Sequence, residues 1–203
     1  MTDTPQTDEP MSAHPMSSGD EDASLITLMA AVAALGWRGL SGPALAAKSG
    51  LPLVEVYRLA PTRAALICRL INRTDRLVLA GTDPADSSPP RDRLFDVMMR
   101  RFDALAPMKP ALQALAAKPD PIALAALAAA LPLSLGWMLD AARIDRRGPL
   151  GLARIAALGR AYAKSAKVWL TDDQADLPKT MAALDSALKA AGSLLAPSEP
   201  KTA

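Results

Sequence analysis

The stretch "GLPLVEVYRLAPTRAAL", residues 50–66, decides the fold of this chain. A glycine opens it, a short apolar segment containing a Tyr-Arg pair follows, and Pro61 stops that segment. Thr62 belongs to the residue types that cap helices, so another helix is expected to begin directly after it. Short helices joined by a glycine turn are typical of a helix-turn-helix, whose second helix enters the DNA major groove. The stretch therefore predicts a DNA-reading helix over about residues 52–59.

The flanking sequence extends this pattern on both sides. Apolar residues recur at spacings of three and four within residues 25–35, which predicts a first helix with Ser24 as its N-cap. Ser41 is expected to cap a second helix, which ends at Gly50. Residues 24–72 are therefore predicted to form a helix-turn-helix head of three helices, from which a fourth leads out.

The rest of the chain predicts further helices between two tails. Half of the residues are hydrophobic and only 3% are aromatic, so Ala and Leu must build most of the core, and the fold class is predicted to be all-α. Residues 1–23, rich in Pro, Ser, Thr and acid, are expected to be a disordered acidic tail, and residues 196–203 a frayed one. Residues 73–195 are expected to form a C-terminal helical domain. Its helices are predicted near residues 90–106, 108–117, 121–143, 149–170 and 174–195.

One of these segments has the length of a membrane span. Residues 121–139 carry no charge, and their number alone permits a transmembrane helix. The segment is mostly alanine and Pro132 interrupts it, so we expect a buried central helix and no stable membrane span. With no basic segment followed by an apolar one at the N-terminus, a cytoplasmic protein is expected.

The residue inventory argues against catalysis and metal binding. The chain has one cysteine and one histidine, His14, which lies in the expected acidic tail. It carries no glycine-rich phosphate loop and no Gly-x-Ser-x-Gly or His-Glu-x-x-His motif. We therefore expect no catalytic residue, no metal site and no cofactor. Asp172, Asp173 and Asp176 are read as acids that cap the last helix.

The layout over residues 25–66 resembles the TetR family of transcriptional regulators. A first helix ends at "LGWRGLS", Gly50 matches the turn glycine, Tyr57 matches the aromatic of the recognition helix, and "PTR" at 61–63 matches the start of the fourth helix. The resemblance implies a helix-turn-helix that binds a double-stranded DNA operator. It also implies a C-terminal pocket for a small apolar effector, and a homodimer formed through the last two helices.

The resemblance also implies which side chains contact DNA. Tyr57 and Arg63 are expected to bind phosphate, and Arg58 to reach a guanine edge. Glu55 stands where the family usually has a small hydroxyl residue, so modest sequence specificity is expected. The expected set of contacts is Arg38, Ser41, Lys48, Glu55, Tyr57, Arg58, Thr62 and Arg63. The arginines farther along the fourth helix, at positions 69, 73 and 76, are expected to form a solvated face.

An apolar pocket is expected among the C-terminal helices, with Met98, Phe102, Leu135, Trp137 and Met138 as its lining. A ligand bound there would change the separation of the two reading heads, so that the dimer fits or misses its half-sites. We expect a ligand-responsive repressor.

A second resemblance keeps another function open. The C-terminal segments "LGWMLDAARID" and "AYAKSAKVWLTDDQADLPKTMAALDSAL" are similar to the lipid-binding accessory protein of ubiquinone biosynthesis, which has a TetR fold and is not a repressor. The shared pattern is a Trp, an Asp-rich turn, a Thr and a closing amphipathic helix. This resemblance implies a lipid or isoprenoid carrier with a degenerate DNA-binding head.

Overall fold

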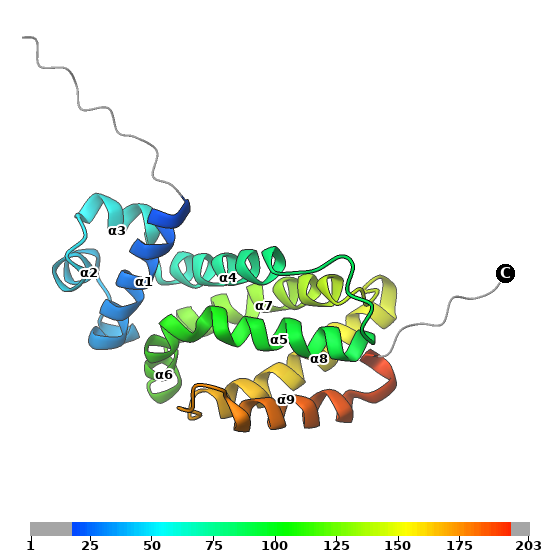
Figure 1. Cartoon of the computed structure of the whole chain (residues 1–203). Helices are drawn as coiled ribbons and strands as arrows, with labels where there is room; N and C mark the ends of the chain where they lie inside the picture. Colours follow the sequence, from blue (N-terminus) through cyan, green and yellow to red (C-terminus); the bar gives the residue numbers. More distant parts are fainter. Residues whose placement is uncertain (1–17, 196–203) are drawn as a thin grey trace, which may run out of the picture.

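The computed structural model describes residues 18–195, and within them every regular element is a helix, which confirms the all-α prediction. Three helices form a small head at one end, and the remaining helices form an elongated body (Figure 1). The head contains α1 (Ser18–Leu35), α2 (Gly42–Ser49) and α3 (Leu53–Leu59). The body contains α4 (Arg63–Ala80), α5 (Pro90–Leu105), α6 (Lys109–Ala117), α7 (Pro121–Ala141), α8 (Gly148–Trp169) and α9 (Pro178–Ala191). The expected tails at 1–17 and 196–203 lie outside the described residues.

Local side-chain chemistry sets the helix boundaries of the head. The Ser41 hydroxyl accepts a hydrogen bond from the amide of Ala44 at 3.3 Å and so caps α2. Gly50 ends α2 with φ of 72°, a left-handed conformation that glycine adopts without steric cost. The Thr62 hydroxyl accepts from the amide of Ala65 at 3.0 Å and caps α4. These caps confirm the predicted helix starts at Ser41 and Thr62.

The first helix is longer than predicted. It begins at Ser18, so residues 18–23 are helical and the expected tail and the Ser24 cap are wrong for this segment. Asp20 and Glu21 lie in the first turn, where acidic side chains stabilise the positive end of the helix dipole. Composition alone indicated disorder here, whereas partners elsewhere in the fold stabilise the segment.

The head is joined to the body by a shared core. The indole N–H of Trp37 donates to the carbonyl of Ala111 in α6 at 2.7 Å, although the two residues are far apart in sequence. Leu66 and Phe102 belong to the same buried cluster as Trp37, so apolar packing continues from α1 through α4 into α5. Because α4 runs without interruption from the head into the body, the two units are mechanically connected.

Helix α7 differs from the buried central helix that was expected. It packs along α4 and also contacts α5 and α8, and its residues 134–136, 138 and 139 are buried. Its opposite face is exposed and carries large apolar side chains, among them Ile122, Leu133 and Trp137. By length and composition this helix is apolar enough to cross a membrane, and only 33% of its most apolar window is buried.

The turn between α8 and α9 is fixed by one buried carboxylate. Asp172 accepts hydrogen bonds from the amide of Thr180 at 2.8 Å and from its hydroxyl at 2.9 Å. Burial raises the pKa of Asp172, but the Thr180 hydrogen bonds outweigh it and hold the pKa below its ordinary value. Asp172 therefore stabilises the first turn of α9, as the sequence predicted, whereas Asp173 lies 3.3 Å from Lys109 and neither it nor Asp176 belongs to the first turn of α9.

Candidate nucleic-acid interface and apolar cavity

The outer face of α3 consists mainly of apolar side chains. Val54 is 76% exposed, Tyr57 71% and Leu53 53%, while Val56 and Leu59 are buried in the core of the head. A short helix that exposes these three side chains offers van der Waals contact and one phenolic hydroxyl to a partner. In a major groove such side chains can contact thymine methyl groups.

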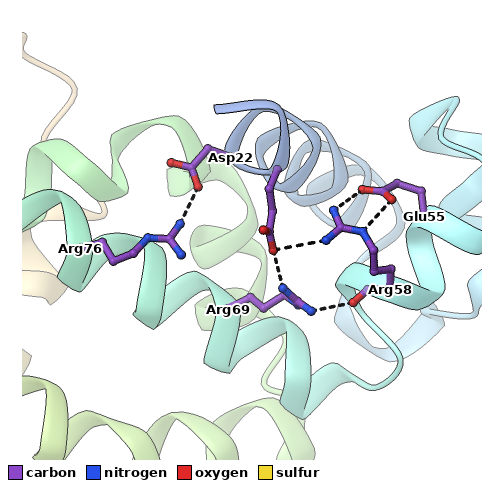
Figure 2. Close-up of polar contacts among 6 residues, drawn as sticks. Asp22, Glu55, Arg58, Arg69 and Arg76 are labelled. Carbon is purple, nitrogen blue, oxygen red and sulfur yellow. Dashed lines mark hydrogen bonds and ion pairs between the residues drawn. The ribbon is translucent and has the colours of Figure 1, made fainter. Parts of the chain in front are cut away.

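The two charged residues of α3 bind each other. The guanidinium of Arg58 donates to both carboxylate oxygens of Glu55, at 2.9 and 2.7 Å (Figure 2). The hydrogen bond from Arg58 is the main reason that the pKa of Glu55 lies below its ordinary value. Both groups are therefore ionised, and binding of Arg58 to a guanine edge requires this pair to open.

Two other residues that were predicted to contact DNA, Arg38 and Arg63, bind groups in the body. Arg63 donates to the carboxylate of Asp120 at 2.6 Å, and Arg38 donates from two nitrogens to the carbonyl of Pro119, at 3.1 and 2.9 Å. Asp120 is buried and also caps α7 by accepting from the amide of Ala123 at 2.9 Å. That backbone hydrogen bond, with further help from Arg63, holds the pKa of Asp120 below its ordinary value. Arg38 of the head and Arg63 at the start of α4 thus both bind the α6–α7 turn.

The remaining predicted contacts are accessible. Ser41, Thr62 and Arg63 border the same surface hollow beside α2. The Ser41 and Thr62 hydroxyl oxygens accept backbone N–H groups, which leaves each O–H able to donate to a phosphate oxygen. Lys48 is exposed at the end of α2 and has no charged partner among the described residues. Ser41, Lys48, Tyr57 and Thr62 are therefore candidate contacts that need no rearrangement.

The arginines along α4 bind acidic residues of α1, contrary to the solvated face that was expected, and of the three only Arg76 is exposed. Arg69 donates to Glu21 and to the carbonyl of Arg58, and Arg76 donates to Asp22 at 2.9 Å (Figure 2). Arg73 is buried, lies 3.4 Å from Asp22 and donates to the carbonyl of Ala104. The prediction is wrong because residues 18–23 are helical and place the acidic side chains of Glu21 and Asp22 beside α4.

An apolar cavity of about 300 Å³ lies in the body beside the head. Side chains from α4, α5, α6, α7 and α8 line it. Leu70, Ile71 and Trp169 are among its buried lining residues, whereas Leu124 and Ala163 are exposed. The exposed residues mark the mouth of the cavity, and the buried ones mark its floor.

The cavity is not where the sequence placed it. None of the five predicted residues is among the described residues that line the cavity. Met98, Phe102, Leu135 and Met138 are buried in the packed core, and Trp137 is exposed with Arg146 over its ring at 5.2 Å. Apolar character alone does not distinguish a side chain that lines a cavity from one that fills a core.

A buried ion pair that sequence analysis missed borders this cavity. Arg101 lines the cavity, is 2% exposed and donates to Asp75 of α4 at 2.6 Å. Asp75 also accepts from the hydroxyl of Ser134 at 2.7 Å. One signal was present in the sequence: Arg101 occurs at helical spacing from Met98 and Leu105, on the apolar face of α5.

Solved structures of TetR transcriptional regulators are similar to this chain. The regulator from Nitrosomonas europaea ATCC 19718 superposes with a TM-score of 0.64 at 21% identity, over 85% of this chain and 97% of that one. The one from Rhodococcus sp. RHA1 has a TM-score of 0.58 at 14% identity, over 87% and 98% of the two chains. The TetR-family regulator from Streptomyces coelicolor has a TM-score of 0.53 at 18% identity, over 89% and 88%. Neither a protein-family model nor a curated protein sequence matches the chain. The head, the shared α4 and the helical body therefore make up a TetR-like fold.

Proposed function

We propose that the protein is a DNA-binding transcriptional regulator of the TetR type that acts as a homodimer and responds to an apolar small molecule. The observation that carries this proposal is the outward face of α3. This face exposes Leu53, Val54 and Tyr57 directly after a glycine turn, in the position of a recognition helix.

The surroundings of α3 support phosphate binding. Lys48 lies at the end of α2, and the hydroxyl groups of Ser41 and Thr62 lie at the starts of α2 and α4. Each group can donate a hydrogen bond to a phosphate oxygen, and such contacts supply much of the affinity of DNA-binding proteins. Because Glu55 holds Arg58, contacts of α3 with thymine methyl groups are expected to contribute more to specificity than a guanine contact.

Helix α4 offers a physical route between ligand and head. Leu70, Ile71 and Thr74 of α4 line the cavity, while Arg63 at the start of the same helix binds Asp120 of the α6–α7 turn. A ligand in the cavity that displaces α4 would move its first turn and the attached α3. In a dimer, this motion would change the distance between the two recognition helices and so the fit to operator half-sites.

Fluorescence anisotropy with labelled duplexes tests DNA binding. One duplex is taken from upstream of the protein's own coding sequence, an unrelated duplex runs beside it, and the salt concentration is varied. We expect preference for the first duplex, a steep loss of affinity with salt, and at least tenfold weaker binding after Lys48→Ala combined with Tyr57→Phe. Arg147→Ala is the matched control, because this exposed side chain lies in the α7–α8 turn, away from the head. Equal, salt-insensitive binding to both duplexes would refute the proposal.

A second candidate function is lipid or isoprenoid binding by an accessory protein whose head no longer reads DNA. Two observations favour it. Arg38, Arg58 and Arg63 all have partners within the protein, and an apolar cavity opens beside the exposed face of α7. Mass spectrometry of the purified protein under native conditions tests this candidate. A stoichiometric co-purifying lipid, together with failure of the anisotropy experiment, would select it over the regulator.

A further inference from the structure

The polar groups at the cavity differ sharply from the rest of its lining. Most of the residues that line the cavity are Leu, Ala, Ile or Pro. Arg101 is the one charged residue among the described residues of this lining. Thr74 also lines the cavity, but its hydroxyl already donates to the carbonyl of Leu70 at 2.8 Å. Arg101 is therefore the one charged group of the described lining, beside the polar ends of Tyr162 and Trp169.

The guanidinium of Arg101 is held from two sides. Its Nη1 donates to Asp75 of α4 at 2.6 Å, and its central carbon lies 5.3 Å from the centroid of the Tyr162 ring of α8. Tyr162 stacks on Phe102 with ring centroids 5.7 Å apart. This packing fixes the guanidinium at the cavity wall, in the manner of an arginine that stacks on an aromatic face.

One nitrogen of Arg101, Nε, is buried without an acceptor among the described residues. A buried N–H without an acceptor costs free energy, so such a group calls for a partner that protein side chains do not supply. Because Arg101 borders the cavity, a small shift of its side chain would bring this buried N–H within reach of an acceptor on a molecule in the cavity.

The charge balance limits what that molecule can be. Asp75 binds Arg101 but does not line the cavity, so the countercharge lies behind the guanidinium. The pair is neutral as a whole, and the described lining contains no second cation. A carboxylate ligand would bring an unbalanced negative charge into an apolar site, which is strongly unfavourable.

We propose that the cavity binds a neutral, predominantly apolar molecule that carries one hydrogen-bond acceptor, such as a ketone, quinone or ester carbonyl, directed at Arg101. This inference rests on the ligand-binding part of the proposed function and names the chemical class of the ligand. At roughly 30 Å³ per water-sized group, the volume holds about ten non-hydrogen atoms, and a longer ligand would extend through the mouth. Tyr162 and Trp169 provide an aromatic wall for the apolar part.

Calorimetric titration of the full chain with three matched probes tests the proposal. The probes are 2-nonanone, nonanoate and nonane, which share a chain length and differ in their polar end. We expect 2-nonanone to bind about tenfold or more tightly than nonane, because hydrogen bonds to charged groups are strong. We expect nonanoate to bind at least tenfold more weakly than 2-nonanone. Tightest binding of nonanoate, equal binding of ketone and alkane, or no binding of any probe would each overturn the proposal.

Substitution of Arg101 tests whether the preference for ketone over alkane depends on this side chain. Arg101→Lys retains a cation for Asp75 but removes the guanidinium donors, so the preference for ketone over alkane should fall to about threefold or less, with nonane binding unchanged. Arg100→Lys is the matched control, because the neighbouring Arg100 donates to the carbonyl of Val78 and does not line the cavity. If Arg101→Lys fails to fold, Arg101→Met combined with Asp75→Asn removes both charges together. An unchanged ketone preference in either folded variant refutes the role of Arg101.

Fluorescence anisotropy with DNA, measured on the same preparation, distinguishes failure of the proposed ligand class from failure of the proposed function. Specific DNA binding without the predicted ligand preference would overturn the ligand class alone. The predicted preference without DNA binding would support the ligand class and refute the regulator.

Discussion

Arg63 and Asp120 form an ion pair at 2.6 Å that joins the first turn of α4 to the start of α7. The same carboxylate caps α7 through the amide of Ala123. One acidic side chain therefore both stabilises a helix start and holds an arginine that the TetR resemblance assigns to DNA. This contact, the Trp37–Ala111 hydrogen bond and the Arg38–Pro119 hydrogen bonds all join the region of the head to the body.

Removal of the Asp120 side chain should destabilise the protein. In Asp120→Ala the α7 cap and the partner of Arg63 are both lost, and we expect the free energy of unfolding to fall by about 1–2 kcal/mol. Asp120→Asn keeps an oxygen for the amide of Ala123 and should lose less. Urea denaturation followed by circular dichroism measures both variants. A larger loss for Asp120→Asn than for Asp120→Ala would contradict the capping role.

Acid should destabilise the fold through two carboxylates. The pKa values of Asp120 and Asp172 lie below their ordinary value in the folded protein, because both accept backbone hydrogen bonds. Their stabilising effect is therefore present above the unfolded pKa of about 3.9 and is lost as pH falls through the lower folded pKa. Thermal unfolding between pH 2 and 7 should show this decline. The decrease of the melting temperature with falling pH should be smaller in the double variant Asp120→Asn and Asp172→Asn. An unchanged decrease would exclude these two carboxylates as its cause.

Neutralising Glu55 should strengthen DNA binding if the proposed function is correct. Glu55→Gln removes a negative charge from the recognition helix and weakens the hold on Arg58, so we expect about two- to fivefold higher affinity. Anisotropy titration at two salt concentrations measures the change. Asp176→Asn serves as control, since it removes an exposed acid in the α8–α9 turn. A lower affinity for Glu55→Gln would indicate that the carboxylate itself contacts a base.

The proposed homodimer should depend on the exposed face of α8. Leu150 and Leu152, both in the first turns of α8, are 47% and 70% exposed in the single chain, and neighbouring exposed apolar side chains mark a candidate interface. We expect Leu152→Glu to convert a dimer into a monomer in sedimentation velocity experiments. Leu53→Glu, on the exposed face of α3, should leave the dimer intact. Dissociation by Leu53→Glu alone would move the interface to the head.

Local signals in the sequence determined the helical elements of this protein. Ser41 and Thr62 start helices because their hydroxyl groups satisfy backbone amides within one turn, and Gly50 ends α2 because it adopts a left-handed backbone conformation. Such interactions involve neighbours in sequence, so residue type and spacing are enough to predict them. The TetR-like arrangement was expected from the resemblance of residues 25–66 to that family.

Only the tertiary structure decided which side chains meet. Arg63 with Asp120, Arg69 with Glu21, and Arg101 with Asp75 are all separated by many residues in the chain. A Coulomb attraction depends on distance in space, and a sequence does not state that distance. The same reason explains the cavity: its lining comes from five helices, and whether an apolar side chain packs or lines a void depends on how those helices fit together.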